Sequence, residues 1–205
     1  MDAPIAVGAE AVVTVSEFLG RKAAVKTRVP KGYRNSELDR RIRTTRTRNE
    51  VRVMQGARSD TVRTPVVYDV DMSECSITME FIEGARVKDL LDADPASSKE
   101  VCRLMGEALA DMHNRGIAHG DFTTSNMILM PDGRLCVIDF SLGSINVGTE
   151  EMGVDIRLLQ RAFSSAHSAV EGGFDAAMES YAEKKTDAGT VLEKVEEIRN
   201  RARYT

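Results

Sequence analysis

The sequence predicts an α+β protein with two lobes, a strand-rich N-terminal part and a helical C-terminal part. Strand-like alternation dominates residues 3–29 and 65–82, one charged helical stretch separates them, and helical periodicity takes over after residues 83–84. The 205 residues are 42% hydrophobic and 29% charged, which is the composition of an ordinary globular protein. We therefore expect an N-terminal lobe at residues 1–82 and a C-terminal lobe at residues 83–205, together forming one domain.

The N-terminal part should contain four strands and one helix. Strands are expected at residues 11–15 and 23–26 around a turn at 19–21, and at residues 65–70 and 75–82 around a turn at 71–73. The helix is expected from about Ser36 to Ala57. Its apolar positions are sparse: Leu38, Ile42, Val51 and Met54.

The C-terminal part should be mainly helical. The clearest helix covers residues 98–115, where apolar side chains recur at helical spacing, Ser97 and Glu100 form a capping-box pattern, and Gly116 ends the run. A β-hairpin is expected at residues 127–138 around a Pro-Asp-Gly turn. Two further helices are expected at about 151–168 and 174–203, and a basic tail begins at about residue 199.

Charge is distributed unevenly along the chain. Residues 21–63 hold 14 of the 28 basic residues and only four acids, although the formal net charge of the whole chain is −4. The arginines between residues 40 and 48 are best interpreted as the solvated face of a helix. The three cysteines are far apart and are expected in the core, and the apolar runs are too short for a membrane span. The N-terminus lacks the pattern of a signal peptide, so a cytoplasmic location is expected.

The chemically informative segment begins at His119. It has the form His-x-Asp, with Asp121, then Asn126 five residues later, and after the hairpin an apolar-Asp-Phe sequence that contains Asp139. This order places Asp121 and Asn126 on one loop and Asp139 at a strand end opposite it. Three side chains with oxygen ligands would then converge, which suits Mg²⁺ bound together with substrate phosphates.

The N-terminal part supplies a complementary cation. Lys26 ends an expected strand, on the opposite face from Val25, where it could hold the α and β phosphates of a nucleotide. Glu50 lies on the following helix and could fix the position of Lys26. Glu37 is the other glutamate in that interval, but the neighbours Val51 and Met54 favour Glu50, because they could dock the helix against a sheet.

Taken together, these motifs resemble the protein-kinase-like fold. The segment His119-Gly120-Asp121-Phe122-Thr123-Thr124-Ser125-Asn126 and the Arg-rich stretch ending in Arg48-Asn49-Glu50 resemble, more narrowly, the small atypical kinase of the KEOPS complex, the PRPK family. The resemblance covers nearly the whole chain. It implies an ATP-hydrolysing atypical Ser/Thr kinase subunit that supports threonylcarbamoyladenosine (t6A) modification of tRNA, with ATP as substrate and Mg²⁺ as cofactor.

The resemblance also implies roles for individual residues. Asp121 would be the catalytic base, and Asp155 would brace the catalytic loop, with His119 as a structural brace. His113 and His167 are expected on helix faces without a special role. Metal ligands would be Asn126 and Asp139. Nucleotide-binding residues would be Lys26 with Glu50, the loop residues Gly8, Ala9 and Glu10, and the hinge residues Glu80 and Ile82.

The partners implied by the resemblance are a threonylcarbamoyl-transferase subunit, other KEOPS subunits and tRNA. The complex and the basic tail residues Arg199, Arg201 and Arg203 would provide the contact with tRNA, and no membrane is involved. The chain departs from ordinary kinases in its single-glycine loop, in Ser141 after Asp139-Phe140, and in the absence of an Ala-Pro-Glu sequence. Two alternatives stay open: a small-molecule phosphotransferase of the aminoglycoside or choline kinase type, and a catalytically weak nucleotide-binding scaffold.

Overall fold

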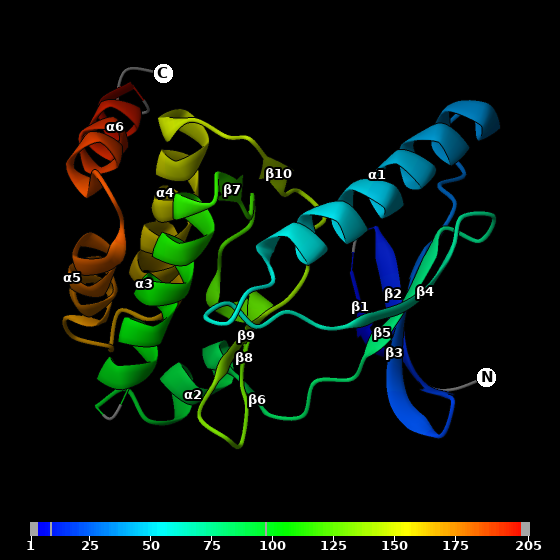
Figure 1. The fold of residues 1–205 in the computed structure, drawn as a ribbon, viewed down its shortest axis with the longest axis horizontal. Coiled ribbons are helices and arrows are strands. Elements are labelled where there is room, and N and C mark those ends of the chain that lie inside the picture. Colours follow the sequence, from blue (N-terminus) through cyan, green and yellow to red (C-terminus); the bar gives the residue numbers. More distant parts are fainter. Residues whose placement is uncertain (1–3, 9, 97, 202–205) are drawn as a thin grey trace.

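The computed structural model describes residues 4–8, 10–96 and 98–201, and it contains a sheet-based N-terminal part beside a bundle of helices (Figure 1). The predicted α+β class is confirmed. Five antiparallel strands form the N-terminal sheet in the order β1-β2-β3-β5-β4. These strands are β1 (Pro4–Val7), β2 (Ala11–Phe18), β3 (Arg21–Arg28), β4 (Val67–Asp71) and β5 (Ser76–Glu80).

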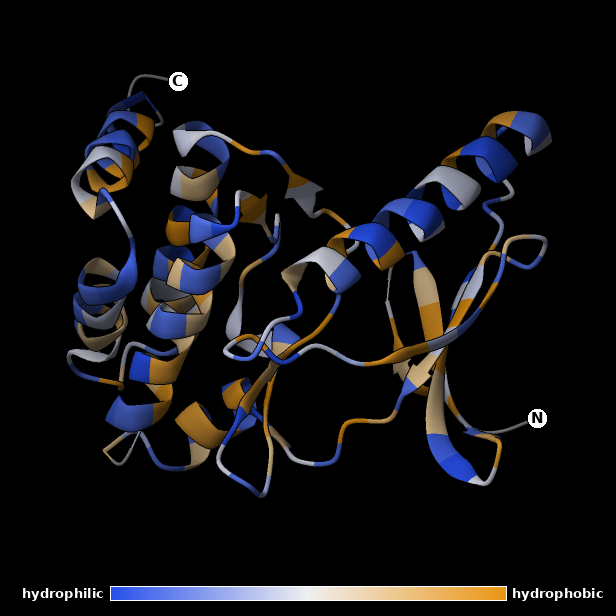
Figure 2. Cartoon of the chain, viewed as in Figure 1, coloured by the Kyte–Doolittle hydropathy of each residue, from blue (hydrophilic) through white to orange (hydrophobic). Residues whose placement is uncertain are grey.

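Helix α1 (Ser36–Ala57) lies against this sheet and occupies the predicted range. It begins where the side chain of Asn35 accepts hydrogen bonds from the main-chain N–H groups of Glu37 and Leu38. Most of its surface is hydrophilic (Figure 2), and it buries a narrow stripe that contains Glu50, Val53 and Met54. Apolar burial is confined to the C-terminal half, because at the other end Leu38 is exposed and the buried residue is Asp39.

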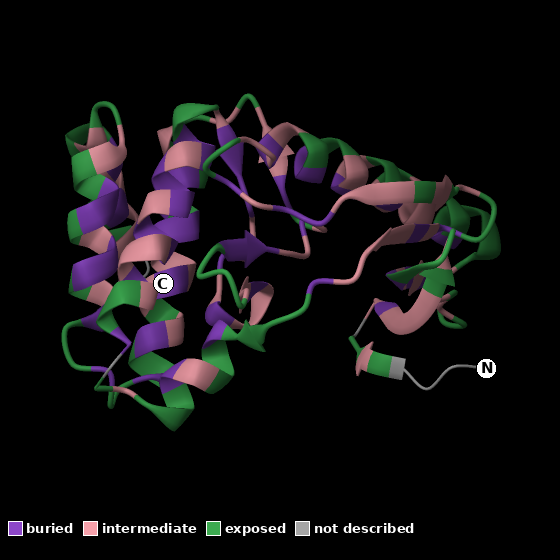
Figure 3. Ribbon diagram, turned by 60° about the horizontal axis from the view of Figure 1, so that its bottom comes forward, coloured by how far each residue is buried: buried purple, intermediate pink, exposed green. Residues whose placement is uncertain are grey.

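The C-terminal part is built on helix α3, whose apolar face was predicted from its periodicity. Leu109 and Met112 of α3, Leu159 of α4 and Tyr181 of α5 are buried in one core (Figure 3). The helices are α2 (Val87–Ala93), α3 (Lys99–Asn114), α4 (Thr149–Ala166), α5 (Gly173–Lys184) and α6 (Ala188–Arg201). Among the described residues, no helix is both long and apolar enough to cross a bilayer.

Short strands carry the loops that face the N-terminal sheet. Strands β6 (Ala85–Arg86), β8 (Met127–Leu129) and β9 (Leu135–Val137) form a three-stranded sheet, and β7 (Ile117–Ala118) pairs with β10 (Ser144–Ile145). The hairpin formed by β8 and β9 is the one that the Pro-Asp-Gly turn predicts. A main-chain hydrogen bond from Val137 to the carbonyl of Arg63 connects β9 to the segment before β4.

Two details of the predicted helices are corrected. The single helix expected at residues 174–203 is two helices, α5 and α6, because Lys185 is extended and Asp187 adopts a φ of +54°. This break lets α5 pack on α3 and α6 pack on α4 (Figure 1). The residue at the N-cap of α3 is Ser98, and its side chain makes no cap hydrogen bond. Ser97, the expected cap, lies outside the described residues.

Candidate active site

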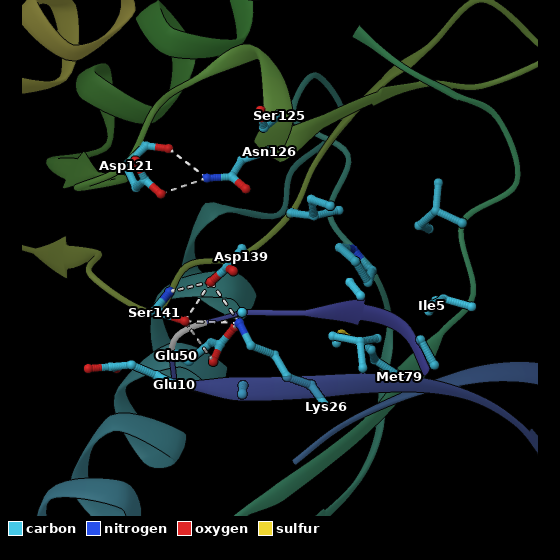
Figure 4. Close-up of a pocket in the computed structure, with 18 of the residues that line it drawn as sticks. Ile5, Glu10, Lys26, Glu50, Met79, Asp121, Ser125, Asn126, Asp139 and Ser141 are labelled. Carbon is cyan, nitrogen blue, oxygen red and sulfur yellow. Dashed lines mark hydrogen bonds and ion pairs between the residues drawn. The ribbon is translucent and has the colours of Figure 1, made fainter. Parts of the chain in front are cut away.

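A pocket of about 630 Å³ lies between the N-terminal sheet and the β8–β9 hairpin. Ala24, Met79 and Ile82 give one part of its wall an apolar character, which suits a flat ring such as adenine. Strands β1 and β2 add further apolar residues, and charged and polar side chains come from α1, β3 and the loops after β7 and β9 (Figure 4). Most of the site residues expected from the sequence line this pocket, including Lys26, Glu50, Asp121, Asn126 and Asp139.

Lys26 is the centre of a buried polar network in this pocket. Its Nζ donates to Glu50 Oε1 and to Asp139 Oδ1, both at 2.7 Å, and to Ser141 Oγ at 2.9 Å. Lys26 is on β3, Glu50 on α1, and the other two residues follow β9, so the network connects both parts of the molecule (Figure 4). A buried ammonium group requires this degree of pairing, because desolvation of an unpaired charge is costly.

Arg28 is a second cation on the same carboxylate. It follows Lys26 by two residues on β3, so its side chain lies on the same face of the sheet. Its guanidinium donates to Glu50 Oε2, and it also donates to Ser141 Oγ at 3.2 Å. Glu50 is 1% exposed and Arg28 is 2% exposed, so these charges are shielded from water. Glu50 is therefore held through both of its oxygens.

Asp139 is held in its ionised form. Burial is the strongest influence and favours the neutral acid, but the charge of Lys26 and the hydrogen bonds from Lys26 and Ser141 outweigh it. Together they lower the pKa of Asp139 to about 2. Asp139 also adopts a φ of +63°, a left-handed conformation that is uncommon for residues other than glycine. An ionised carboxylate in this position is a suitable ligand for a hard cation.

Asp121 and Asn126 lie on the loop between β7 and β8. The Asn126 Nδ2 group donates to the carboxylate of Asp121 and to its main-chain carbonyl, each at 2.9 Å. Because the amide nitrogen is turned toward Asp121, its carbonyl oxygen Oδ1 points the other way (Figure 4). Asn126 Oδ1 and the carboxylate of Asp139 are hard oxygen donors in one pocket, so these residues fit Mg²⁺.

Asp155 of α4 braces this loop from behind. The main-chain N–H of His119 donates to Asp155 Oδ2 at 2.6 Å, and that of Gly120 donates to Oδ1 at 2.8 Å. Gly120 has a φ of +77°, and a Cβ there would lie 2.2 Å from the carbonyl oxygen of Leu142. The backbone beside Asp121 is therefore fixed by a buried charge on one side and by close packing on the other.

His119 connects the loop to the strand end that carries Asp139. The main-chain N–H of Asp121 donates to His119 Nδ1 at 3.2 Å, so Nδ1 must be unprotonated. The proton of the neutral ring is then on Nε2, which lies 3.0 Å from the carbonyl oxygen of Ile138. His119 is 0% exposed and has both ring nitrogens occupied.

His113 and His167, which were expected on helix faces, are at the C-terminal ends of α3 and α4. Both are buried and hydrogen-bonded behind the loop rather than idle on helix faces. His113 contacts the Tyr181 hydroxyl at 2.9 Å and Asp155 at 3.4 Å. His167 contacts Thr124 at 2.8 Å and Asp92 at 3.0 Å. Burial lowers the pKa of His113 despite the nearby Asp155 carboxylate, which acts in the opposite direction.

The loop expected to cover a nucleotide connects β1 to β2. Gly8 and Glu10 line the pocket, whereas Ala9 lies outside the described residues. Glu10 forms an ion pair with Arg46 of α1, and its Oε2 is 4.0 Å from an Arg28 nitrogen. The hydrogen bond from Arg46 is the main reason that the pKa of Glu10 is lowered. Gly8 donates its main-chain N–H to the carbonyl of Ala11 at 2.9 Å.

The expected hinge follows β5. Glu80 and Ile82 line the pocket. The side chain of Glu80 is turned toward Arg63 and toward the main-chain N–H of Val66, which donates to it at 3.0 Å. The main-chain N–H of Glu80 donates to the Val66 carbonyl at 2.8 Å. The N–H and the carboxylate of Glu80 are therefore already engaged within the chain.

The pocket residues that were not assigned to the site from the sequence include Arg28, Ser141 and Arg46, and Arg46 lines the pocket instead of lying on the solvated helix face expected for it. The spacing of Arg28 from Lys26 on one strand could have indicated it, because alternate residues share a face. Ser141 stands out in the sequence only as a departure from glycine, yet its hydroxyl contacts Lys26, Arg28, Glu50 and Asp139. In the basic tail, Arg199 and Arg201 lie on α6, and Arg203 lies outside the described residues. Arg201 forms an ion pair with Glu150.

Comparison with known proteins identifies the relatives of this chain. The model of the RIO domain family matches residues 9–167. The KEOPS complex subunit Bud32 of Pyrococcus abyssi is 40% identical over an alignment of 207 positions, which covers 96% of this chain and 94% of that protein. The EKC/KEOPS complex subunit Tp53rkb of Mus musculus is 38% identical, with 96% and 84% covered.

A longer relative matches along part of its length. A probable bifunctional tRNA threonylcarbamoyladenosine biosynthesis protein of Methanosarcina mazei is 44% identical over 198 residues, which are 96% of this chain but 35% of that protein. The chain therefore spans about a third of the length of such bifunctional relatives. The family predicted from the His119–Asn126 segment is confirmed. Because the RIO model covers most of the chain and relatives of similar length match it nearly end to end, the chain belongs to the protein-kinase-like RIO domain family and, within it, to the PRPK group that includes Bud32 and Tp53rkb.

Proposed function

We propose that this chain is an ATP-hydrolysing atypical Ser/Thr kinase that supports t6A modification of tRNA as a subunit of a KEOPS-type complex. The observation that carries the proposal is the pocket in which the Lys26–Glu50–Asp139 network faces the Asp121–Asn126 loop. Its partners would be a threonylcarbamoyl-transferase subunit and other KEOPS subunits. Relatives at 40% and 38% identity bear KEOPS subunit names, and the longer relatives bear the name of the tRNA modification.

In this proposal the apolar wall of the pocket binds adenine and the polar part binds the phosphates. The Glu80 carbonyl and the Ile82 main-chain N–H would contact the ring edge, and Lys26 would hold the α and β phosphates while Glu50 fixes its position. Asn126 and Asp139 would hold Mg²⁺, which neutralises phosphate charge when it is bound. Lys26 donates to Asp139 Oδ1, so the other oxygen of that carboxylate, Oδ2, would be the one to bind the cation.

Asp121 would act as the catalytic base. Its carboxylate accepts a hydrogen bond from Asn126, and its backbone is fixed through Asp155 and His119, so it can orient a water molecule or a hydroxyl group for attack. Water needs no docking platform, whereas a protein substrate does. Only eight residues separate Phe140 from the first residue of α4, and this short segment favours ATP hydrolysis as the main reaction.

The fate of the γ-phosphate tests the proposal. Purified chain is incubated with γ-labelled ATP and Mg²⁺, with and without a threonylcarbamoyl-transferase subunit, beside Asp121→Ala. We expect label to be released as inorganic phosphate and turnover to fall by about 10²–10⁴ in the variant. Exposed Asp175 on α5 provides the matched control, and Asp175→Ala should keep wild-type turnover.

The alternative functions would give different results. Label transferred to an aminoglycoside or to choline would support a small-molecule phosphotransferase. Nucleotide binding without turnover, even with the partner present, would support a scaffold. Turnover that survives Asp121→Ala would contradict the assigned base.

A further inference from the structure

Three charged side chains line the pocket beyond Lys26, away from Ala24 and Met79: Arg28, Arg46 and Glu10. Residues 24, 26 and 28 of β3 all line the pocket, because alternate residues of a strand share a face. Ala24 pairs with Met79 in the sheet, at the apolar wall. Two residues span about 7 Å of strand, so Lys26 lies about 7 Å along β3 from Ala24, and Arg28 lies about 14 Å from it. The strand therefore has an apolar position, then an ammonium group, then a guanidinium group.

Helix α1 brings a second guanidinium to the same end. Arg46 precedes Glu50 by four residues, so both side chains lie on one face of the helix, one turn apart. Glu50 reaches Lys26 and Arg28, and Arg46 also lines the pocket. Arg28 and Arg46 therefore approach the same space from the sheet and from the helix.

A carboxylate of the chain itself occupies that space. Glu10, in the loop between β1 and β2, forms an ion pair with Arg46 and lies 4.0 Å from Arg28. Figure 4 shows Glu10 and Met79 on opposite sides of the Lys26 network. The two arginines thus already bind an anion at this end of the pocket.

Arg28 has hydrogen-bonding capacity that the chain leaves unused. It is 2% exposed, and its Nε finds no acceptor among the residues that the structure describes. The nitrogen that faces Glu10 is 4.0 Å from its carboxylate, beyond hydrogen-bond distance, so an incoming anion that comes closer would gain a charge-assisted hydrogen bond from this guanidinium. Guanidinium groups suit phosphate because they can donate two parallel hydrogen bonds.

The loop between β1 and β2 is poorly suited to bind phosphate through its main chain, so side-chain donors are needed. It has one glycine in the segment Gly8-Ala9-Glu10-Ala11, whereas loops that cradle phosphates through main-chain N–H groups are rich in glycine. Lys26 is already shared between Glu50 and Asp139. Arginine side chains are therefore the cations best placed to bind a phosphate beyond Lys26.

We propose that Arg28 and Arg46 form a subsite for the terminal phosphate of a nucleoside triphosphate, and that Glu10 occupies this subsite until the nucleotide displaces it. The proposal rests on the proposed function, because it assumes that the pocket binds ATP. It assigns the Glu10 side chain the role of an internal competitor rather than that of a nucleotide ligand.

Nucleotide titrations test the proposal. The dissociation constants of a non-hydrolysable ATP analogue, ADP and adenosine are measured by calorimetry with Mg²⁺ for the wild type, Arg46→Gln and Glu10→Gln. Arg46→Gln should weaken binding of the triphosphate about tenfold or more, the scale of one lost charge-assisted hydrogen bond, and change ADP and adenosine by less than about twofold. Glu10→Gln should strengthen binding of the triphosphate, because the competing charge is removed.

Arg48→Gln is the matched control. Arg48 is exposed on the same helix and does not line the pocket, so its loss should leave all three constants unchanged. Arg28 is left intact, since it also holds Glu50. Thermal unfolding of each variant verifies that it is folded before titration.

The titrations distinguish a phosphate subsite from a latch that only holds the loop closed over nucleotide. If the Glu10–Arg46 pair were such a latch, both substitutions would weaken binding, and the proposal would be wrong. An equal loss for the triphosphate and ADP would also overturn it. Wild-type protein that binds no nucleotide would instead refute the proposed function.

Discussion

Replacing Asp155 with Asn tests how firmly the loop that carries Asp121 is held. In the wild type, one carboxylate accepts main-chain hydrogen bonds of 2.6 Å from His119 and 2.8 Å from Gly120, and Asp155 is 0% exposed. The variant has nearly the same volume, so no cavity forms. Its single amide oxygen can accept one of the two bonds, and its NH₂ group faces the other N–H donor.

The loss of folding stability in Asp155→Asn can be worked out from these two hydrogen bonds. A buried donor that loses its acceptor costs about 1–3 kcal/mol, and the surviving bond loses the share that came from the charge, on the order of 1 kcal/mol. We therefore expect Asp155→Asn to lower the free energy of unfolding by about 2–4 kcal/mol. Relief of this strain by a shift of the loop is restricted, because Gly120 packs against Leu142.

Urea unfolding followed by circular dichroism measures the effect. With a slope of about 2 kcal/mol per molar urea, the midpoint should fall by about 1–2 M. Glu179→Gln is the control, since Glu179 is exposed on α5 and should change stability by less than about 0.5 kcal/mol. A loss below about 1 kcal/mol in Asp155→Asn would refute the reasoning, because it would mean that the two N–H groups do not depend on the charge.

The remaining predictions concern packing and pH. Gly106→Ala should destabilise the protein by about 1–3 kcal/mol or more in urea unfolding, because the new Cβ would lie 1.9 Å from the carbonyl oxygen of Ala177 on α5. Gly189→Ala on α6, with nothing within 4 Å, should be neutral or stabilising, and equal losses in the two variants would contradict this account. Since burial lowers the pKa of His113, the unfolded state takes up a proton near pH 6.5 that the folded state resists. The free energy of unfolding should therefore decrease as the pH falls from about 7.5 to 5.5, by up to about 1.4 kcal/mol per pH unit, and His113→Gln should lack this contribution. The same pH dependence in the wild type and His113→Gln would show that His113 is not its source.

Local sequence patterns were sufficient to predict most of the larger helices and strands. The range of α1, the periodic face of α3 and the hairpin around residues 131–133 depend on neighbours within a few residues. The helix expected at 174–203 was missed for a physical reason. Its sequence has no proline and few breakers, so the turn at Lys185 and Asp187 depends on tertiary contacts. These contacts are the packing of α5 on α3 and of α6 on α4, and the hydrogen bonds that the Asn114 side chain of α3 makes with Lys184 and Thr186.

In the candidate site, too, some residues could be predicted from local sequence and others only from tertiary contacts. Asp121, Asn126 and Asp139 are recognisable because their spacing is fixed by one loop and one hairpin, and Lys26 because it ends a stretch of strand residues. Arg28 and Ser141 carry no motif. They acquire a place in the pocket only because α1 and the segment after β9 both approach β3.

The sequence by itself determined the larger elements and the side chains that could bind a nucleotide, since those depend on periodicity and on short spacings, and its motifs resemble the protein-kinase-like class. Only the tertiary structure decided how their charges are distributed. It placed two cations on Glu50, turned Glu10 toward Arg46 rather than toward solvent, and buried His113 behind Asp155. Each of these contacts joins residues at least 22 positions apart, where Coulomb attraction depends on distance in space and leaves no periodic trace in the sequence.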